Sequence, residues 1–503
     1  NCMNMIYITK GWLISAMIIG AGLFSACEDG LELGKTADES HYQGIYENTL
    51  TLSDVRTNTQ SILVDLYKNE EHSTYTTDIR IELKKVLSKD ASIKVSVDAD
   101  YLAVYNAEHD TDFELYPGVV TLEGDGVVAI DAGLKSVKIG LSIARGEVED
   151  VIEKDKTYLL PLSISEQNTG LEINETNSHC VYLITDKSGV NDCDKSENHS
   201  IKGFLFFEVN DVNPLNAFSF ELENGKLLWD VVVLFAANIN YDKVEGRPYL
   251  YFNPNVRYLL DNNEKFIQPL RQRGIKVLLG ILGNHDVAGV AQLSDVAARD
   301  FARELAEICR IYKLDGVNFD DEYSKDPDLS NPVFVERSTK AAARLCYETK
   351  RCMPEKMVAV YAYGKMYGES YVDNTHHARE WMDVVVPDYP DTENGVFNNI
   401  LPGLSLTHYA GISMEFNDGR GPNLNNYFAK QLKSKGYGWF MGFAANPLYY
   451  TKAKTNDMGQ VVAQPIWDRL ANVTDLYGLG LKAPAIYYEK NDPTPYPYGM
   501  LGN

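Results

Sequence analysis

The sequence is poor in cysteine and in positive charge. Its 503 residues include only 7 cysteines, and none shows the C-x-x-C or Cys/His spacing of a zinc site. An odd number cannot all pair internally, so we expect neither a zinc site nor a disulfide framework. Two pairs that are close in sequence, Cys180 with Cys193 and Cys346 with Cys352, stay open as bridges. The 47 Lys and Arg against 71 Asp and Glu give a formal charge of −24, which repels phosphate backbones and argues against a nucleic-acid partner.

Several catalytic and binding motifs are also missing. The sequence has no P-loop, no G-x-S-x-G, no H-E-x-x-H and no G-x-G-x-x-G in a βαβ context, which sets aside phosphate, serine-hydrolase and dinucleotide chemistry. His376 and His377 are adjacent and have no evident third ligand, so they do not predict a metal centre. What is present is a normal globular balance of 45% hydrophobic and 23% charged residues, long enough for two or three folded units.

The first 27 residues have the pattern of an export signal. Lys10 precedes an apolar run over residues 11–26 that ends in small residues before Cys27. This resembles a bacterial lipoprotein signal, in which Cys27 becomes the lipidated first residue; a plain signal peptide with an incidental cysteine is the alternative. No other apolar run reaches the roughly eighteen residues that a membrane span needs. We therefore expect a signal over 1–27, a polar tether over 28–47 and an exported, lipid-anchored protein, on the outer membrane, the cell surface or the periplasmic face.

The next region, 48–190, has the alternating pattern of β-strands. Short runs in which apolar and polar residues alternate are separated by Gly, Asp and Asn turns. The seven runs span residues 61–67, 78–83, 92–97, 127–130, 137–143, 158–162 and 181–184. Such a series predicts an all-β sandwich, with one short helix over 101–106. No catalytic constellation falls in it, so we expect a spacer or a glycan contact, with the spacer role favoured.

A polar stretch over 187–200 then ends this pattern and a different one begins. Continuous apolar strands now alternate with helical segments such as 295–312 and 333–348. The eight candidate strands are 204–207, 231–235, 277–282, 316–319, 358–361, 384–386, 410–414 and 439–443. Buried parallel strands that alternate with helices predict a (β/α)8 barrel over 200–490. Chemistry in that fold lies at the carboxyl ends of the strands.

Polar residues gather at those strand ends, most densely at the fourth. There Asn318, Asp320 and Glu322 follow one another at period two, which places them on one face of the strand. Stacked acids repel, so at least one should titrate high, as a general acid requires. The alternatives are a solvated acidic strand end and a divalent-cation site. Earlier strands end in Glu208, Asn238, Asn284 and His285, which we expect to bind substrate.

The run Leu314 to Tyr323 resembles the D-x-x-D-x-D-x-E signature of family 18 glycoside hydrolases, in the form found in endo-β-N-acetylglucosaminidases of the Endo H type. Residues 235–242 and 274–285 resemble the second and third strands of those enzymes, in the same order. The β-region similarly resembles the N-terminal domains that precede catalytic domains in Bacteroidetes surface lipoproteins. The resemblance implies a hydrolase that acts on N-glycans and needs no cofactor or metal.

Motif by motif, the resemblance assigns roles to individual residues. Glu322 matches the general acid/base, Asp320 the acid that orients the N-acetyl group, and Tyr389 a tyrosine that hydrogen-bonds that group. Asn318 stands where the family has Asp; its amide cannot share a proton with Asp320, which should make Asp320 easier to ionise. Trp439, at the eighth strand, is expected as an aromatic floor under the sugar or as a core residue.

The resemblance also implies the mechanism and leaves two rivals. Family 18 enzymes use the substrate's own acetamide as nucleophile in place of a second carboxylate. The bond expected to break is the GlcNAc-β1,4-GlcNAc link of an N-glycan core, and high-mannose glycans are the favoured substrate class. A non-catalytic glycan-binding protein on the same barrel and a chitinase-type hydrolase remain alternatives. The sequence does not predict an oligomeric state.

Overall fold

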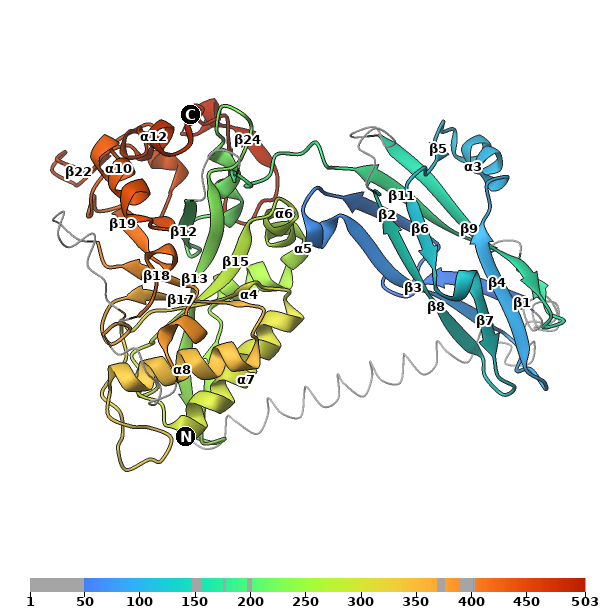
Figure 1. Cartoon of the computed structure of the whole chain (residues 1–503), viewed down its shortest axis with the longest axis horizontal. Helices are drawn as coiled ribbons and strands as arrows, with labels where there is room; N and C mark the ends of the chain where they lie inside the picture. The colour runs from blue at the N-terminus through green and yellow to red at the C-terminus, as the bar shows by residue number, and fades with distance from the viewer. Residues whose placement is uncertain are drawn as a thin grey trace, which may run out of the picture. The chain divides into compact units, whose positions relative to one another are not determined.

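The chain forms two compact units. The computed structural model describes residues 49–146, 156–174, 178–196, 201–368, 376–389, 401 and 403–502. The units divide between Ser188 and Gly189 (Figure 1). The predicted signal, tether and Cys27 lie outside the described residues. Within the described part, no helix has both the length and the apolar character needed to cross a membrane.

The N-terminal unit consists of two β-sheets. The first has the order β10-β1-β3-β8-β6, and the second β2-β11-β9-β4-β7 with β5 beside β9. The strands of the first sheet are β10 (Glu172–Ile173), β1 (Thr49–Asp54), β3 (Thr74–Leu83), β8 (Ser136–Ala144) and β6 (Val119–Leu122). Those of the second are β2 (Ser61–Leu66), β11 (His179–Asp186), β9 (Thr157–Gln167), β4 (Ala91–Val97), β7 (Val127–Ile130) and β5 (Glu114–Leu115).

The alternating pattern accounts for this packing. Ile79 and Ile81 of β3 are fully buried, and so are Ile93 and Val95 of β4 on the other sheet. The residues between each pair are partly exposed. One apolar cluster draws residues from both sheets, so the predicted sandwich is confirmed. Each of the seven predicted runs overlaps one strand, and the helix predicted over 101–106 is the start of α3 (Tyr101–His109). The strand β1 and the shorter strands β5, β6 and β10 were not predicted.

The C-terminal unit is built on eight parallel strands. Their order is β18-β17-β16-β15-β13-β12-β20-β19, and a parallel bridge between Val385 and Tyr409 joins the two ends of this series. The strands are β12 (Lys202–Glu208), β13 (Trp229–Asp242), β15 (Lys276–Leu282), β16 (Gly316–Phe319), β17 (Met357–Ala362), β18 (Val384–Pro387), β19 (Ala410–Glu415) and β20 (Trp439–Phe443). Each contains one predicted strand, and the predicted (β/α)8 barrel is confirmed.

Helices cover the outside of the barrel, and short strands extend its loops. The helices are α4 (Pro254–Asp261), α5 (Asn263–Phe266), α6 (Gln268–Gln272), α7 (Asp295–Ile311), α8 (Thr339–Cys352), α10 (Asn426–Lys435), α11 (Ile466–Arg469) and α12 (Val473–Tyr477). The further strands are β14 (Arg247–Tyr251), β21 (Lys454–Thr455), β22 (Val461–Ala463), β23 (Ile486–Tyr488) and β24 (Pro495–Pro497). One large apolar cluster fills the space between strands and helices, and a second fills the barrel interior.

Helix α8 begins later than predicted. The sequence pattern placed its start at Val333, but the Val335 N–H donates to the Gln292 carbonyl, which holds this stretch extended. Ser338 then caps the helix by accepting a hydrogen bond from the Ala341 N–H. The apolar residues 333–335 therefore belong to the loop that precedes α8.

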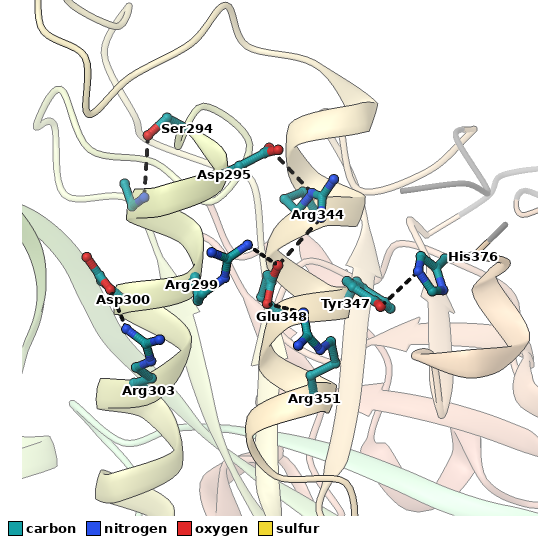
Figure 2. A network of polar contacts seen from close by, with 11 residues as sticks. Ser294, Asp295, Arg299, Asp300, Arg303, Arg344, Tyr347, Glu348, Arg351 and His376 are labelled. Atoms are coloured by element: carbon teal, nitrogen blue, oxygen red, sulfur yellow. Dashed lines mark hydrogen bonds and ion pairs between the residues drawn. The ribbon is translucent and has the colours of Figure 1, made fainter. Parts of the chain in front are cut away.

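An ionic network joins α7 to α8, which lie side by side (Figures 1 and 2). The carboxylate of Glu348, 1% exposed, contacts Arg299 of α7 at 3.3 Å and Arg344 and Arg351 of its own helix at 3.5 and 3.3 Å. Glu348 is buried and the three arginines are partly exposed, so its carboxylate is the shared partner that holds these side chains together.

The cysteines form no bridges among the described residues. Cys180, Cys193, Cys309 and Cys346 are buried free thiols and Cys352 is a partly exposed one. The two pairs left open by the sequence are therefore both unbridged.

Candidate active site

The fourth barrel strand sends alternate residues to opposite sides. Val317 and Phe319 pack into the layer under the helices, which turns Asn318 and Asp320 toward the barrel interior. Asp321 faces outward, where Arg337 contacts it at 2.8 Å and the Lys365 N–H donates to it at 2.7 Å. Of the three consecutive acids, Asp321 thus forms a structural ion pair, while Asp320 and Glu322 face the barrel mouth.

The first acid of the motif, Asp315, is structural. It forms a buried ion pair with Arg271 at 2.9 Å and accepts a hydrogen bond from the Val277 N–H at 2.9 Å. These contacts tie the start of β16 to β15 and α6, at the opposite end of the strand from the chemistry.

A cavity of about 520 Å³ opens at the carboxyl ends of the strands. Seven of the predicted site residues line it: Glu322, Asp320, Tyr389, Glu208, Asn238, Asn284 and His285. Further aromatic and cationic residues complete the wall, namely Phe206, Phe235, Tyr323, Tyr361, Tyr363, Phe443 and Arg420. The mixture of carboxylates, amides and ring faces suits a sugar ligand.

Two predicted site residues do not line this cavity. Trp439 is the first residue of β20 and packs edge-on against Phe204 in the barrel interior, with ring centroids 6.0 Å apart. Met441 and Phe443, further along the same strand, reach the cavity instead. Trp439 is therefore a core residue, because parallel strands present only their carboxyl ends to the site.

Asn318 lies below the cavity and is fully buried. Its amide oxygen and nitrogen have no hydrogen-bond partner among the described residues. It cannot bind substrate directly where it lies, and any influence it has passes through Asp320, its neighbour on the same face.

Asp320 and Glu322 are linked by a hydrogen bond. Burial and the nearby Glu322 carboxylate raise the pKa of Asp320 well above its ordinary value, so Asp320 is the donor in this bond. Burial raises the pKa of Glu322, while the hydrogen bond from Asp320 and the positive charge of Arg420 oppose that rise. In this arrangement the two carboxyl groups share one proton, which Asp320 carries.

The backbone around Glu322 is held closely. Its carbonyl accepts a hydrogen bond from the Gly283 N–H at 3.0 Å, across the loops that follow β15 and β16. A Cβ on Gly283 would lie 2.5 Å from that same carbonyl oxygen, which leaves room for glycine alone. Gly283 thus sets how far Glu322 projects over the cavity.

Tyr389 sits among aromatic and charged groups that fix its ring. The Tyr361 ring centroid is 5.9 Å away, and the Arg420 guanidinium lies 4.6 Å from the Tyr389 centroid. Burial raises the pKa of Tyr389 well above its usual value, so its hydroxyl stays protonated and can donate a hydrogen bond. Tyr361 donates to Asp388, which follows β18 and precedes Tyr389.

Arg420 was not predicted from the sequence. It lies in the polar run 417–421 after β19, which the pattern of strand-end residues would have reached had it been followed to the seventh strand. Buried Arg469 secures this loop by donating to the carbonyls of Glu415, Arg420 and Gly421. The loop therefore presents its one cation to the cavity from a fixed base.

Comparison with known proteins agrees with this geometry. A family model described as an N-terminal domain matches residues 43–171. Endo-beta-N-acetylglucosaminidase F1 of Elizabethkingia meningoseptica is 45% identical over 249 residues, covering 49% of this chain and 72% of that protein. The chain belongs to the family 18 endo-β-N-acetylglucosaminidases. It is a glycoside hydrolase, as the signature at Leu314 to Tyr323 implied.

Solved structures extend the likeness of this endo-β-N-acetylglucosaminidase to both units. EndoBT-3987 of Bacteroides thetaiotamicron, in complex with Man5GlcNAc product, is 48% identical and matches with a TM-score of 0.57 over 89% of this chain and 99% of that one. The same protein in complex with a Man9GlcNAc2Asn substrate is 46% identical over the same shares, with a TM-score of 0.56. The endo-β-N-acetylglucosaminidase fold is thus shared beyond the barrel.

Proposed function

We propose that this endo-β-N-acetylglucosaminidase cuts the GlcNAc-β1,4-GlcNAc bond in the core of high-mannose N-glycans, and that the substrate's own acetamide is the nucleophile. The observation that carries the mechanism is the hydrogen bond between Asp320 and Glu322. Carboxyl groups in that contact have oxygens about 3 Å apart, too close to flank a sugar as an acid and a nucleophile about 5 Å apart.

The first step forms a cyclic intermediate. The acetamide carbonyl oxygen attacks C1 of the donor GlcNAc while protonated Glu322 gives its proton to the leaving oxygen, and the C1–O bond breaks. Ionised Asp320 accepts a hydrogen bond from the acetamide N–H, and the Tyr389 hydroxyl donates one to the acetamide oxygen. The single proton of the pair has then passed from Asp320 to Glu322 and on to the leaving group.

The second step restores the enzyme. The Glu322 carboxylate takes a proton from a water molecule, whose oxygen attacks C1 from the face that the leaving group vacated. The bond from C1 to the acetamide oxygen breaks, and the acetamide reforms. Two inversions at C1 give net retention.

The glycan class is supported by the relatives. EndoBT-3987 was crystallised with Man9GlcNAc2Asn and with Man5GlcNAc. The amides Asn238 and Asn284 and the carboxylate Glu208 line the cavity and offer polar contacts to sugar hydroxyls. We therefore propose Man5 to Man9 glycans as the substrate class.

The test is release of glycan from a high-mannose glycoprotein, followed by mass spectrometry. Wild type should release glycans that end in a single GlcNAc, and Glu322→Gln should lower the rate by at least about 10²-fold. Glu208→Gln is the matched control for a cavity carboxylate outside the proposed chemistry, and it should keep far more of kcat. Equal losses in the two variants would contradict the general acid/base role of Glu322, and binding without release by wild type would indicate a lectin.

We also propose that the protein is exported and anchored through a lipid on Cys27. The support is the apolar run over residues 11–26 and the small residues before this cysteine. Fatty-acid labelling of cells that express the full chain should mark wild type and not Cys27→Ser. Equal labelling of both would refute the anchor.

A further inference from the structure

A second cavity lies within the sandwich unit. Its volume is about 780 Å³, against about 520 Å³ for the cavity in the barrel, and it falls in the range of about 300–1,000 Å³ that is common for ligand sites. Two loops form its walls: residues 85–90 lie between β3 and β4, and residues 168–171 lie between β9 and β10. Thr49, Ala91 and Glu172 complete the lining. We call this space the sandwich cavity.

Hydrogen bonds fix the loop that follows β9. The Asn168 side chain accepts one from the Ser92 N–H at 2.7 Å, which ties this loop to β4. The Gln167 side chain donates to the Leu171 carbonyl at 2.8 Å and accepts from the Thr169 N–H at 2.7 Å. These bonds hold the loop at both of its ends.

The loop before β4 is held by the turn that joins β7 to β8. The Ala132 N–H donates to the Asp90 carboxylate at 2.8 Å, and the Gly133 N–H donates to the Leu87 carbonyl at 3.0 Å. Both walls of the sandwich cavity are thus in place before a ligand arrives, which reduces the entropy lost on binding.

Two cationic side chains of the lining are unpaired. They belong to a basic run around the start of β4, of which Lys84 and Lys94 lie outside the cavity and each pair with a glutamate, at 2.9 and 3.3 Å. Lys85 and Lys89 line the sandwich cavity and have no ion-pair partner among the residues that the structure describes. Their ammonium groups are therefore available as hydrogen-bond donors to a ligand.

The charges of the lining balance. Besides the two lysines it contains two carboxylates, Asp90 and Glu172, so its formal charge is zero in a chain of −24. Ammonium groups only donate hydrogen bonds and carboxylates only accept them, whereas a hydroxyl group does both. Buried Leu87 and Leu171 and exposed Val86 add apolar contact surface. These features match a neutral sugar, which carries many hydroxyl groups and an apolar C–H face.

We propose that the sandwich cavity is a second carbohydrate-binding site, which takes a neutral oligosaccharide and carries out no chemistry. Lys85 and Lys89 donate hydrogen bonds to sugar hydroxyls, and Asp90 and Glu172 accept hydrogen bonds from them. None of the described residues that line the cavity is aromatic, so binding depends on these hydrogen bonds. The site adds glycan binding to the spacer role that the sequence favours for this unit, and it is independent of the proposed cleavage in the barrel.

Photolabelling of the full chain locates the site directly. The probe is a mannose oligosaccharide that carries a diazirine and has no N-acetyl group, so the proposed chemistry of the barrel does not cut it. Peptide mapping by mass spectrometry should find the label within residues 85–91 and 168–172. At a probe concentration well below saturation, Lys85→Ala combined with Lys89→Ala should lower this label at least about tenfold, because two hydrogen bonds from charged donors are lost.

Lys135→Ala combined with Lys138→Ala is the matched control. Both lysines are exposed, belong to the same unit and do not line the sandwich cavity, and their removal changes the net charge by the same amount. This control should keep the wild-type label. Equal labelling of the two double variants would place the binding elsewhere and overturn the inference.

Two comparisons separate this site from the proposed function and from an anion site. Stronger labelling by a sialylated oligosaccharide, lost at high salt, would show an anionic ligand and overturn the neutral class. Absence of label in the sandwich unit, while the same preparation releases glycan from a high-mannose glycoprotein, would overturn this inference alone. Label in the sandwich cavity without any release of glycan would overturn the proposed function and support this site.

Discussion

Asn318 of β16 and Asp320, which directly follows this strand, face the same side, and the Asn318 amide carries no charge. Asn318→Asp would place a second buried carboxyl group beside Asp320, and a like charge raises the pKa of its neighbour. The acid pair must keep one proton for the first step, so activity falls on the alkaline side when that proton is lost.

We therefore expect Asn318→Asp to move the alkaline limb of the kcat/KM profile to higher pH, by up to about one unit. Rates on a high-mannose glycopeptide between pH 4 and 9 measure it. Asn318→Ala, which adds no charge, is the control. A shift to lower pH would mean that the added group does not face Asp320.

Arg420 should act on the same limb through charge. Its guanidinium opposes the rise in the pKa of Glu322, so Arg420→Gln raises that pKa further. Glu322 then keeps its proton to higher pH, and the alkaline limb moves upward. Arg420→Lys retains the positive charge and should keep the limb near that of wild type, although it loses the guanidinium that lies over the Tyr389 ring. Identical profiles for the Gln and Lys variants would refute this electrostatic role.

At this scale the sequence predicted part of the site. The acids were accessible because one strand end carries Asn318, Asp320 and Glu322 at period two, and Tyr389 because it follows a strand of the resembling family. Arg420 was missed because the strand-end pattern was not followed to the seventh strand, and the hydrogen bonds from Arg469 that hold its loop join residues distant in the sequence. Trp439 stayed open between a cavity floor and a core residue because ring chemistry says nothing of which end of a strand a residue occupies.

At the scale of elements, the close approach of the loops after β15 and β16 controls Glu322. Gly283→Ala would place a Cβ 2.5 Å from the Glu322 carbonyl oxygen and push the two loops apart. Displacing the acid by about 1 Å should lower kcat about 10²-fold, with a smaller change in KM. Steady-state kinetics check this, and an unchanged melting temperature would separate it from loss of folding. Wild-type kcat in the variant would contradict the positioning role.

The network between α7 and α8 predicts a stability effect. Glu348→Ala leaves Arg299, Arg344 and Arg351 without their shared carboxylate, and it should lower the free energy of unfolding by about 1–3 kcal/mol (Figure 2). Asp300→Ala, which breaks the exposed pair with Arg303 in the same figure, should cost less than about 1 kcal/mol. Urea unfolding compares the two, and equal losses would contradict the central place of Glu348.

The elements themselves were largely predictable. Barrel strands are buried on both faces and read as continuous apolar runs, which is why all eight were found. Sandwich strands alternate, and seven of them were found for that reason, but β1 was missed although it has six residues. Strands of two residues such as β10 and β5 carry too few positions to show a period. The start of α8 depends on a backbone hydrogen bond to Gln292, a contact distant in sequence.

In the whole molecule, the two units have separate hydrophobic cores, so a substitution can destabilise one unit without the other. Ile79 of the sandwich and Leu279 of the barrel are both fully buried. Ile79→Ala and Leu279→Ala should each cost about 2–5 kcal/mol, in different units. Calorimetry should show two unfolding transitions. The transition of the sandwich should move to lower temperature in Ile79→Ala, and the transition of the barrel in Leu279→Ala. Hydrolysis of a free glycopeptide should persist at the wild-type rate in Ile79→Ala below its transition; loss of that activity would contradict a spacer role for the sandwich.

The unbridged cysteines bear on how the protein can be handled. Burial raises the pKa of Cys180 and of Cys309 to about 12, so almost no thiolate forms there at neutral pH to react with oxidants or alkylating reagents. The described cysteines hold no crosslink that a reductant would cut. Production in a reducing host cytoplasm and storage with dithiothreitol should therefore both leave the barrel and its chemistry intact.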